Sequence, residues 1–226
     1  MAEGKLKIYL IPGLGFDDRI FSKLNLTSYN PTYLNWIEPL ENESIQQYAH
    51  RFSDSIDDSD KTVLIGHSLG GIISQEIAAF KNIDLIILLS SIRSRDEMPF
   101  FFKIIQPLYL HKLFTKQLTF KTFPFWAKQH DYETEEEQAL FKSMVGKQSN
   151  QYLQWALKEL SKWQTPQLLP NTKVIQIVGK KDKTFPIRNI KSPDVMVEDG
   201  GHFMTFKKPK LISKYIVEEN QLIINQ

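Results

Sequence analysis

Residues 63–73 constrain the fold of this chain more than any other stretch. The apolar run Val63-Leu64-Ile65 leads into Gly66-His67-Ser68-Leu69-Gly70, and a segment of small and apolar residues suited to a helix follows. A serine flanked by glycines at such a junction predicts a sharp strand-to-helix turn, because glycine leaves room where the strand and the helix approach each other. The amino end of the helix would direct free N–H groups and partial positive charge towards Ser68. We therefore interpret this stretch as a nucleophile elbow rather than as an ordinary βα turn.

Strand-like and helical segments alternate along much of the remaining chain. The other strand-like segments are mostly apolar and cover Lys5–Ile11, Tyr33–Ile37, Asp84–Ser90, Lys173–Val178 and Asp194–Val197. Amphipathic spacing predicts a helix over residues 44–56, with Ser44 as its cap, and a closing helix over 208–219. Nearly continuous apolar strands are typical of a parallel sheet that is covered on both faces. The pattern predicts an α/β fold with a mainly parallel sheet flanked by helices.

Residues 93–170 interrupt this alternation, because they contain helical patterns but no convincing strand. Amphipathic helices are expected over residues 135–145 and 152–163. We expect one helical unit inserted into a core formed by residues 1–92 and 171–226.

The first part of this insertion is rich in aromatic residues. Aromatic side chains on helices either form the wall of a ligand pocket or only pack the helices onto the rest of the protein, and both readings stay open. Docking of the run Phe100-Phe101-Phe102 on a membrane is the weaker hypothesis, since no basic amphipathic face accompanies the run.

The composition narrows the available chemistry. The 226 residues include no cysteine, which excludes disulfides, thiolate metal sites and a cysteine nucleophile. The formal net charge of +2 gives no reason to expect nucleic acid or an anionic surface as the main partner. His111 and His130 lack paired ligand spacing, so we expect no metal there, and no motif indicates a cofactor.

The chain also contains no apolar stretch of membrane-spanning length, so we expect no stable membrane insertion. Its amino terminus lacks the apolar core and the small-residue cleavage site of a signal peptide. We therefore expect a cytoplasmic protein that acts on a small molecule, and the sequence does not predict its oligomeric state.

A serine hydroxyl becomes a good nucleophile only when a base takes its proton, and that base is usually an imidazole oriented by a carboxylate. In a parallel sheet both groups should follow later strands, because all strands end at the same edge. Asp182 follows one buried strand within Gly179-Lys180-Lys181-Asp182, and His202 follows the next within Gly200-Gly201-His202-Phe203. These two residues are the expected acid and base.

The other histidines fit this role less well. His202 alone among the five histidines is framed by glycines after a strand, which lets its ring approach a neighbouring loop. His50 falls within a predicted helix, where a solvated surface position is expected. His67 precedes Ser68 directly, and we expect it to pack within the loop.

Together these motifs resemble the α/β-hydrolase superfamily. The match runs through Pro-Gly-Leu-Gly at 12–15, Gly-His-Ser-Leu-Gly-Gly at 66–71, Gly-Lys-Lys-Asp at 179–182 and Gly-Gly-His-Phe at 200–203. The chain order of serine, aspartate and histidine is also that of the superfamily.

The resemblance implies that Ser68 is the nucleophile, His202 the general base and acid, and Asp182 the orienting acid. It also implies an oxyanion hole made by the backbone N–H groups of Leu14 and Leu69. The helical insertion would be the superfamily's cap.

The chain departs from the superfamily pattern in two places. Pro12-Gly13 stands where the superfamily often has His-Gly, so no side chain contributes to the oxyanion loop at that position. By this resemblance the first strand of the chain corresponds to the third strand of the full fold, so we expect a small version of the fold with a mainly parallel sheet of about six strands. Some members of the superfamily place the acid after the strand before the cap, which makes Asp96 the alternative to Asp182; we prefer Asp182 because it lies in a tight loop rather than in a charged run.

The implied activity is the hydrolysis of a carboxylic ester, thioester or amide of a small apolar substrate through an acyl-enzyme on Ser68. We favour a carboxylic ester, because an aromatic and aliphatic cap suits an acyl or aryl group. The same scaffold also carries non-hydrolytic enzymes, such as lyases and acyltransferases, and catalytically silent binding proteins. A complete set of Ser68, Asp182 and His202 argues against a pure binding protein.

Overall fold

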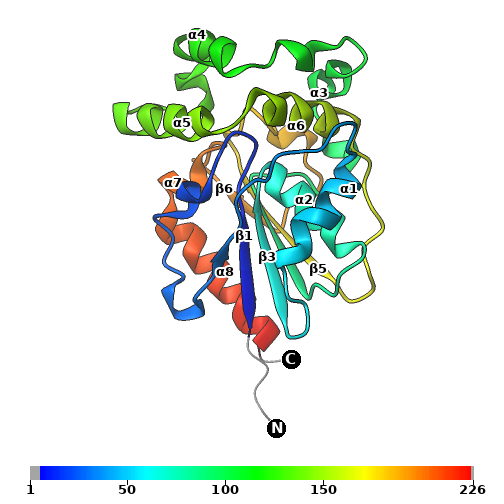
Figure 1. Cartoon of the computed structure of the whole chain (residues 1–226). Coiled ribbons are helices and arrows are strands. Elements are labelled where there is room, and N and C mark those ends of the chain that lie inside the picture. The colour runs from blue at the N-terminus through cyan, green and yellow to red at the C-terminus, as the bar shows by residue number, and fades with distance from the viewer. Residues whose placement is uncertain (1–5, 225–226) are drawn as a thin grey trace.

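A computed structural model of the chain describes residues 6–224. Its centre is a single sheet of six parallel strands in the order β2-β1-β3-β4-β5-β6 (Figure 1). The strands are β1 (Lys7–Ile11), β2 (Thr32–Tyr33), β3 (Thr62–His67), β4 (Leu85–Leu89), β5 (Lys173–Gly179) and β6 (Val195–Val197). The predicted α/β fold with about six parallel strands is confirmed.

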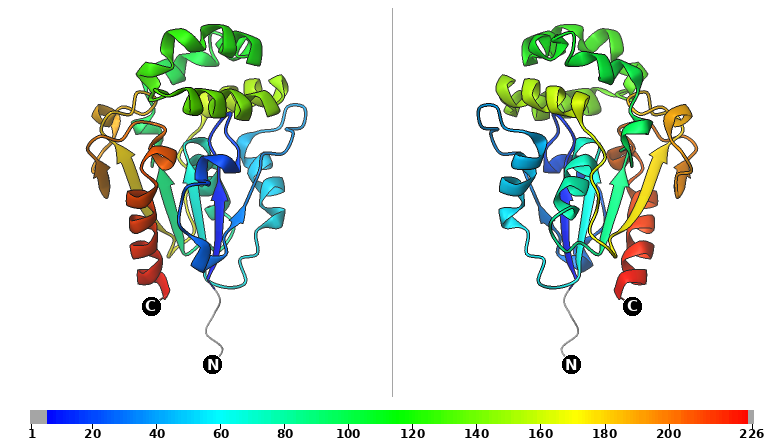
Figure 2. Two further views of the ribbon diagram at one scale, coloured as in Figure 1. Left: turned by 90° about the vertical axis from the view of Figure 1, so that its left-hand side faces the viewer. Right: turned by 90° about the vertical axis from the view of Figure 1, so that its right-hand side faces the viewer.

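Helices cover both faces of this sheet. Helices α1 (Ile45–Phe52) and α2 (Leu69–Ala78) lie on one face, and α8 (Pro209–Ile224) lies on the other, preceded by the short helix α7 (Met204–Lys207) (Figure 2). Every residue of β3, β4 and α2 is buried, so the core is centred on the strand and helix that flank Ser68. Complete burial explains why these strands read as unbroken apolar runs.

The edge of the sheet differs from the sequence-based expectation. The predicted strand over Tyr33–Ile37 is wrong, because β2 contains only two residues, both exposed. One more ladder bond follows, from the amide of Leu34 to the carbonyl of Leu10. Beyond it, the backbone N–H and C=O of Ile37 bond to the Tyr48 hydroxyl instead of to a strand. Side-chain partners from α1 therefore replace the sheet partners that a longer strand would need.

The helix boundaries follow capping residues. Ser44 caps α1 and forms a reciprocal capping box with Gln47, as the predicted cap position requires. Thr134 does the same for the helix that starts at Glu135, with Glu137 as its partner.

The insertion contains helices α3 (Phe100–Ile105), α4 (Lys116–Trp126), α5 (Glu135–Lys147) and α6 (Asn150–Lys162). It lies above the carboxyl ends of the strands, with α5 and α6 nearer the sheet and α3 and α4 forming the outermost layer (Figures 1 and 2). No helix among residues 6–224 combines the length and the apolar character needed to cross a bilayer.

Candidate active site

Ser68 occupies a strained turn between β3 and α2. Its backbone adopts φ 52° and ψ −117°, which places a non-glycine residue at positive φ. A Cβ atom on Gly66 would lie 2.3 Å from the backbone nitrogen of Gly71, and one on Gly70 would lie 2.1 Å from the carbonyl oxygen of Ile11. The two glycines are therefore required because the backbones of β1, β3 and α2 touch directly around Ser68.

The backbone of Ser68 is fixed from the neighbouring strand. Its amide donates to the carbonyl of Leu89 over 2.9 Å, and its carbonyl accepts from the Ser91 hydroxyl over 2.7 Å. These bonds hold the strained conformation in place, so the hydroxyl projects from the carboxyl edge of the sheet.

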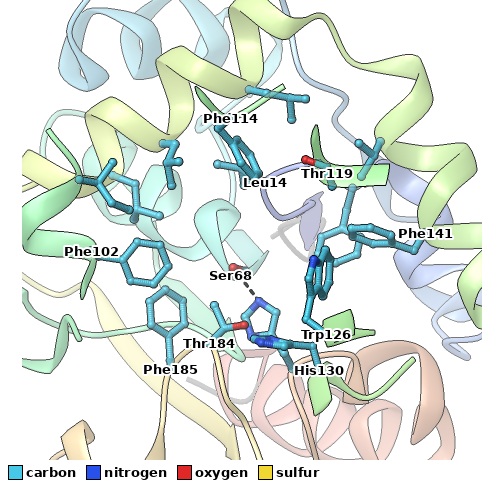
Figure 3. Close-up of a pocket in the computed structure, with 18 of the residues that line it drawn as sticks. Leu14, Ser68, Phe102, Phe114, Thr119, Trp126, His130, Phe141, Thr184 and Phe185 are labelled. Carbon is cyan, nitrogen blue, oxygen red and sulfur yellow. Dashed lines mark hydrogen bonds between the residues drawn. The ribbon is translucent and has the colours of Figure 1, made fainter. Parts of the chain in front are cut away.

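His202 and Asp182 reach Ser68 from the loops that follow β6 and β5. The two loops lie against each other at Gly179, where a Cβ atom would come within 2.3 Å of the carbonyl oxygen of Gly200. Nε2 of His202 lies 3.0 Å from the Ser68 hydroxyl oxygen, and Nδ1 of His202 lies 2.8 Å from Oδ2 of Asp182. The dashed line in Figure 3 marks the bond to Ser68.

The hydrogen bonds of Asp182 define which nitrogen of His202 carries a proton. Its Oδ1 accepts from the amides of Thr184 and Phe185 over 2.7 and 2.9 Å, and its Oδ2 faces His202. An ionised carboxylate accepts all three bonds, so Nδ1 of His202 carries a proton and Nε2 is free to accept one from Ser68. Ser68, Asp182 and His202 are all buried, which strengthens these interactions.

The structure brings Asp182, and not Asp96, to His202. The side chain of Asp96 is 75% exposed and pairs with Lys191 on the surface. Its position fits the solvated charged run expected from the sequence.

Two backbone N–H groups beside Ser68 have no partner within residues 6–224. They belong to Leu14, in the loop after β1, and to Leu69, the first residue of α2. The amino end of α2 adds partial positive charge at the same place. An oxygen atom that gains negative charge next to Ser68 would find two free donors there.

His67 lies next to the hydrogen-bonded residues Ser68, His202 and Asp182 and holds the backbone of one of them. It is fully buried, and its Nε2 donates to the backbone carbonyl of His202 over 3.0 Å. Burial, followed by the charge of His202, lowers the pKa of His67 to about 3, so its imidazole is neutral. The expected packing role of His67 therefore includes holding the backbone of the residue that contacts Ser68.

Ser68 and His202 open into a cavity of about 380 Å³ between the sheet and the insertion (Figure 3). Its wall is largely aromatic and aliphatic, and no lysine, arginine, aspartate or glutamate lines it among the residues described. The apolar lining includes Leu14, Phe16, Phe101, Phe102, Ile105, Phe114, Trp126, Phe141, Val145, Leu153, Leu157, Leu160 and Phe185. The aromatic residues of the insertion thus divide between lining this cavity and packing the helices.

A few polar groups interrupt the apolar wall. Thr119, on α4, is 5% exposed; its hydroxyl finds no hydrogen-bond partner within residues 6–224 and points into the cavity. His130 also lines the cavity, and burial together with the nearby His202 lowers its pKa. Sequence reasoning missed both positions, because neither residue belongs to a motif and their place in the cavity wall depends on how the insertion folds.

An ionic contact joins the insertion to the loop that carries His202. The carboxylate of Asp131, in the insertion, pairs with Lys207 of α7 over 2.7 Å. A Cβ atom on Gly201 would lie 2.5 Å from the same carboxylate. The insertion is therefore in direct contact with the residue before His202. Within residues 6–224 no group of three His, Asp or Glu side chains is arranged to hold a metal ion.

Comparisons with known proteins show the family and the fold of the chain. The model of the alpha/beta hydrolase family matches residues 8–213. The solved structures similar to this one include an esterase from Exiguobacterium antarcticum, with a TM-score of 0.74 and 16% identity over 99% of this chain and 93% of the other. A carboxylesterase structure from Nitrososphaera gargenis has a TM-score of 0.76 and 19% identity over 98% of this chain and 92% of the other.

The similar structures are not restricted to esterases. A putative non-heme bromoperoxidase from Mycobacterium tuberculosis has a TM-score of 0.67 and 15% identity over 96% of this chain and 92% of its own. Comparison with curated proteins gave no match. At these identities the solved structures support the fold, and the family model covers most of the sequence. The chain therefore belongs to the alpha/beta hydrolase family.

Proposed function

We propose that the protein is a serine hydrolase that cleaves carboxylic esters of small apolar substrates through an acyl-enzyme on Ser68. The observation that carries this proposal is the buried chain of hydrogen bonds from Ser68 through His202 to Asp182, which opens into an apolar cavity. Thioesters and amides would react by the same steps, and the apolar wall favours an acyl or aryl group over a charged one.

In the first half of the reaction, the Ser68 hydroxyl oxygen attacks the ester carbonyl carbon while Nε2 of His202 takes the hydroxyl proton. The amides of Leu14 and Leu69 stabilise the negative oxygen of the tetrahedral intermediate. The intermediate collapses when the bond to the leaving alkoxide breaks and His202 returns the proton to that oxygen. The alcohol leaves, and the acyl group remains on Ser68.

In the second half, water replaces the alcohol. His202 takes a proton from the water as its oxygen attacks the acyl carbon, and it then protonates Ser68 as the ester bond to the enzyme breaks. Asp182 keeps the His202 ring in the required tautomer and stabilises the imidazolium form in both halves. The helical insertion, residues 93–170, would act as the cap that selects the acyl group.

A fluorophosphonate probe tests the nucleophile directly. The folded wild-type protein should gain the mass of one adduct, and the Ser68→Ala variant should gain none. Turnover of a series of p-nitrophenyl esters from acetate to octanoate should then show a preference for uncharged alkyl chains over succinate-type esters with a carboxylate. An unlabelled Ser68 in folded protein would overturn the proposal, whereas labelling without ester turnover would favour a lyase or an acyltransferase.

A further inference from the structure

The outermost layer of the insertion exposes many large apolar side chains. Eight of the eleven exposed large apolar residues found in the described part of the chain lie between residues 100 and 125. They are Phe100, Phe101, Leu108, Tyr109, Leu110, Leu113, Leu118 and Phe125. Phe125 is 82% exposed and Phe100 is 75% exposed. Single exposed apolar residues are common on proteins, but such a concentration marks an interaction surface.

The same segment carries positive charge only. Residues 98–130 contain five lysines and no aspartate or glutamate, although the whole chain has a net charge of only +2. The lysines are Lys103, Lys112, Lys116, Lys121 and Lys128. None of the five forms an ion pair with any residue in the described part of the chain, so their charges are available to a partner.

Helix α4 shows how the two properties share one face. Leu118, Lys121 and Phe125 are spaced by three and four residues, so they lie on the same side of the helix and are all exposed. Thr119 and Phe123 lie on the buried side. Helix α4 is thus amphipathic in an unusual sense, because its solvent face combines apolar and basic side chains.

We propose that this apolar and basic surface, residues 100–128, docks on the surface of an anionic phospholipid bilayer. Exposed apolar side chains insert among the lipid headgroups, and lysines bind the anionic lipids. No spanning helix is required for binding of this kind. A second copy of the chain is a poor occupant, because the same five positive charges would then face each other. Sequence alone did not favour membrane docking, since the lysines that accompany Phe100-Phe101-Phe102 lie mostly on later elements of the insertion.

The surface is continuous with the wall of the cavity. Phe101 is half exposed and also lines the cavity above Ser68, and α3 and α4 contribute Phe102, Thr119 and Trp126 to the same wall. This docked orientation would place the roof of the cavity against the lipid. If the protein hydrolyses esters as proposed above, its substrates would be uncharged acyl esters that partition into a bilayer. This part of the inference rests on the proposed function.

Flotation of the full chain with liposomes tests the docking without any need for turnover. We expect binding to vesicles of phosphatidylcholine with 30% phosphatidylglycerol, weak binding to pure phosphatidylcholine, and release at high salt. The Lys112→Gln/Lys121→Gln/Lys128→Gln variant should bind on the order of a hundredfold more weakly. The Lys191→Gln/Lys210→Gln/Lys214→Gln variant removes the same charge from other exposed positions and should bind like the wild type.

The apolar part has its own matched pair. The Phe100→Ser/Phe125→Ser variant should lose vesicle binding, whereas Leu40→Ser/Met196→Ser, which removes exposed apolar side chains elsewhere, should not. Both of these double variants should hydrolyse a water-soluble p-nitrophenyl ester at the wild-type rate, because none of the four substituted residues lines the cavity. Vesicle binding by the Ser68→Ala variant would support docking independently of catalysis. The docking proposal would then hold even if the ester proposal failed.

Three results would overturn the docking proposal. One is the absence of wild-type binding to anionic vesicles at low salt. Another is binding that both lysine variants lose equally. The third is a concentration-dependent dimer, seen by analytical ultracentrifugation, that Phe100→Ser/Phe125→Ser abolishes, which would assign the surface to a second copy.

Discussion

The imidazole of His67 holds the backbone of His202, with 3.0 Å between Nε2 and the carbonyl oxygen. The residue before Ser68 in the chain therefore fixes the residue that hydrogen-bonds to Ser68 in space. The bond requires a proton on Nε2, and the buried ring stays neutral because its pKa is lowered to about 3.

This neutrality predicts acid sensitivity. Well above pH 6.5 His67 is neutral in both the folded and the unfolded protein, so it adds no pH dependence there. As the pH falls from 6.5 towards 3, the unfolded chain binds a proton that the folded protein does not, and the free energy of unfolding falls by up to about 1.4 kcal/mol per pH unit from this group.

The His67→Gln variant should show a flatter decline of stability over this range, although its stability at pH 8 will be lower. Urea denaturation of both proteins from pH 8 to pH 4 measures the difference, in which the contribution of the carboxylates cancels. Parallel slopes for the two proteins would contradict a neutral, buried His67.

The identity of the acid can be tested by two asparagine substitutions. Asp182→Asn should reduce kcat by about a thousandfold to ten-thousandfold, because an amide at this position favours the wrong tautomer of His202. Asp96→Asn should leave kcat within about twofold, since Asp96 only pairs with Lys191 on the surface. Steady-state kinetics on one p-nitrophenyl ester suffices, and a large loss in the Asp96 variant with little loss in the other would reverse the assignment.

The unpartnered hydroxyl of Thr119 predicts a gain of stability on its removal. Thr119→Val keeps the shape of the side chain and should raise the free energy of unfolding by about 1 kcal/mol, because a buried polar group without a partner is destabilising. The added methyl group should also raise kcat/KM for alkyl esters by about fourfold.

Thr205 provides the matched control, since its hydroxyl is equally buried and unpartnered but lies outside the cavity. Thr205→Val should raise stability and leave kcat/KM unchanged. An equal change of kcat/KM in both variants would show that the cavity position of Thr119 is irrelevant to substrate binding.

The contact between Asp131 and Lys207 predicts coupling between the insertion and the His202 loop. Lys207→Met should lower the free energy of unfolding by about 1–3 kcal/mol, because it leaves the mostly buried carboxylate of Asp131 without its partner. It should also lower kcat, because Asp131 packs against Gly201 and a shift of Asp131 would move the neighbouring His202.

The double variant Asp131→Asn/Lys207→Met should recover part of this stability, because the carboxylate that lies closest to Lys207 is then neutralised, although Glu133 and Glu137 still lose their partner. Lys180→Met serves as the comparison: Lys180 and Glu198 form an exposed pair, and breaking it should cost less than about 1 kcal/mol. Thermal denaturation combined with kcat separates these cases, and equal losses in Lys180→Met and Lys207→Met would rule out a special role for the contact.

The sequence predicted those features that local chemistry and strand order determine. Ser68 and Asp182 follow buried strands and His202 follows the edge strand β6, and all these parallel strands end at one edge of the sheet, so their meeting was predictable without coordinates. The short β2 was not, because an edge strand has no burial pattern and depends on partners such as the Tyr48 hydroxyl. The pairing of Asp131 with Lys207 joins positions far apart in the chain, and nothing local to either residue indicates the other.

That pairing also limits how the gene can be rearranged. Ser68, Asp182 and His202 are all encoded outside residues 93–170. If the proposed function holds, exchanging this segment between related genes would transfer the preference for acyl groups and leave the proposed reactive residues untouched. Lys207, however, stays behind in the recipient. A transplanted segment therefore needs acidic residues that can pair with Lys207, as Asp131, Glu133 and Glu137 do here, and recombinants that lack them should be poorly stable in engineered libraries.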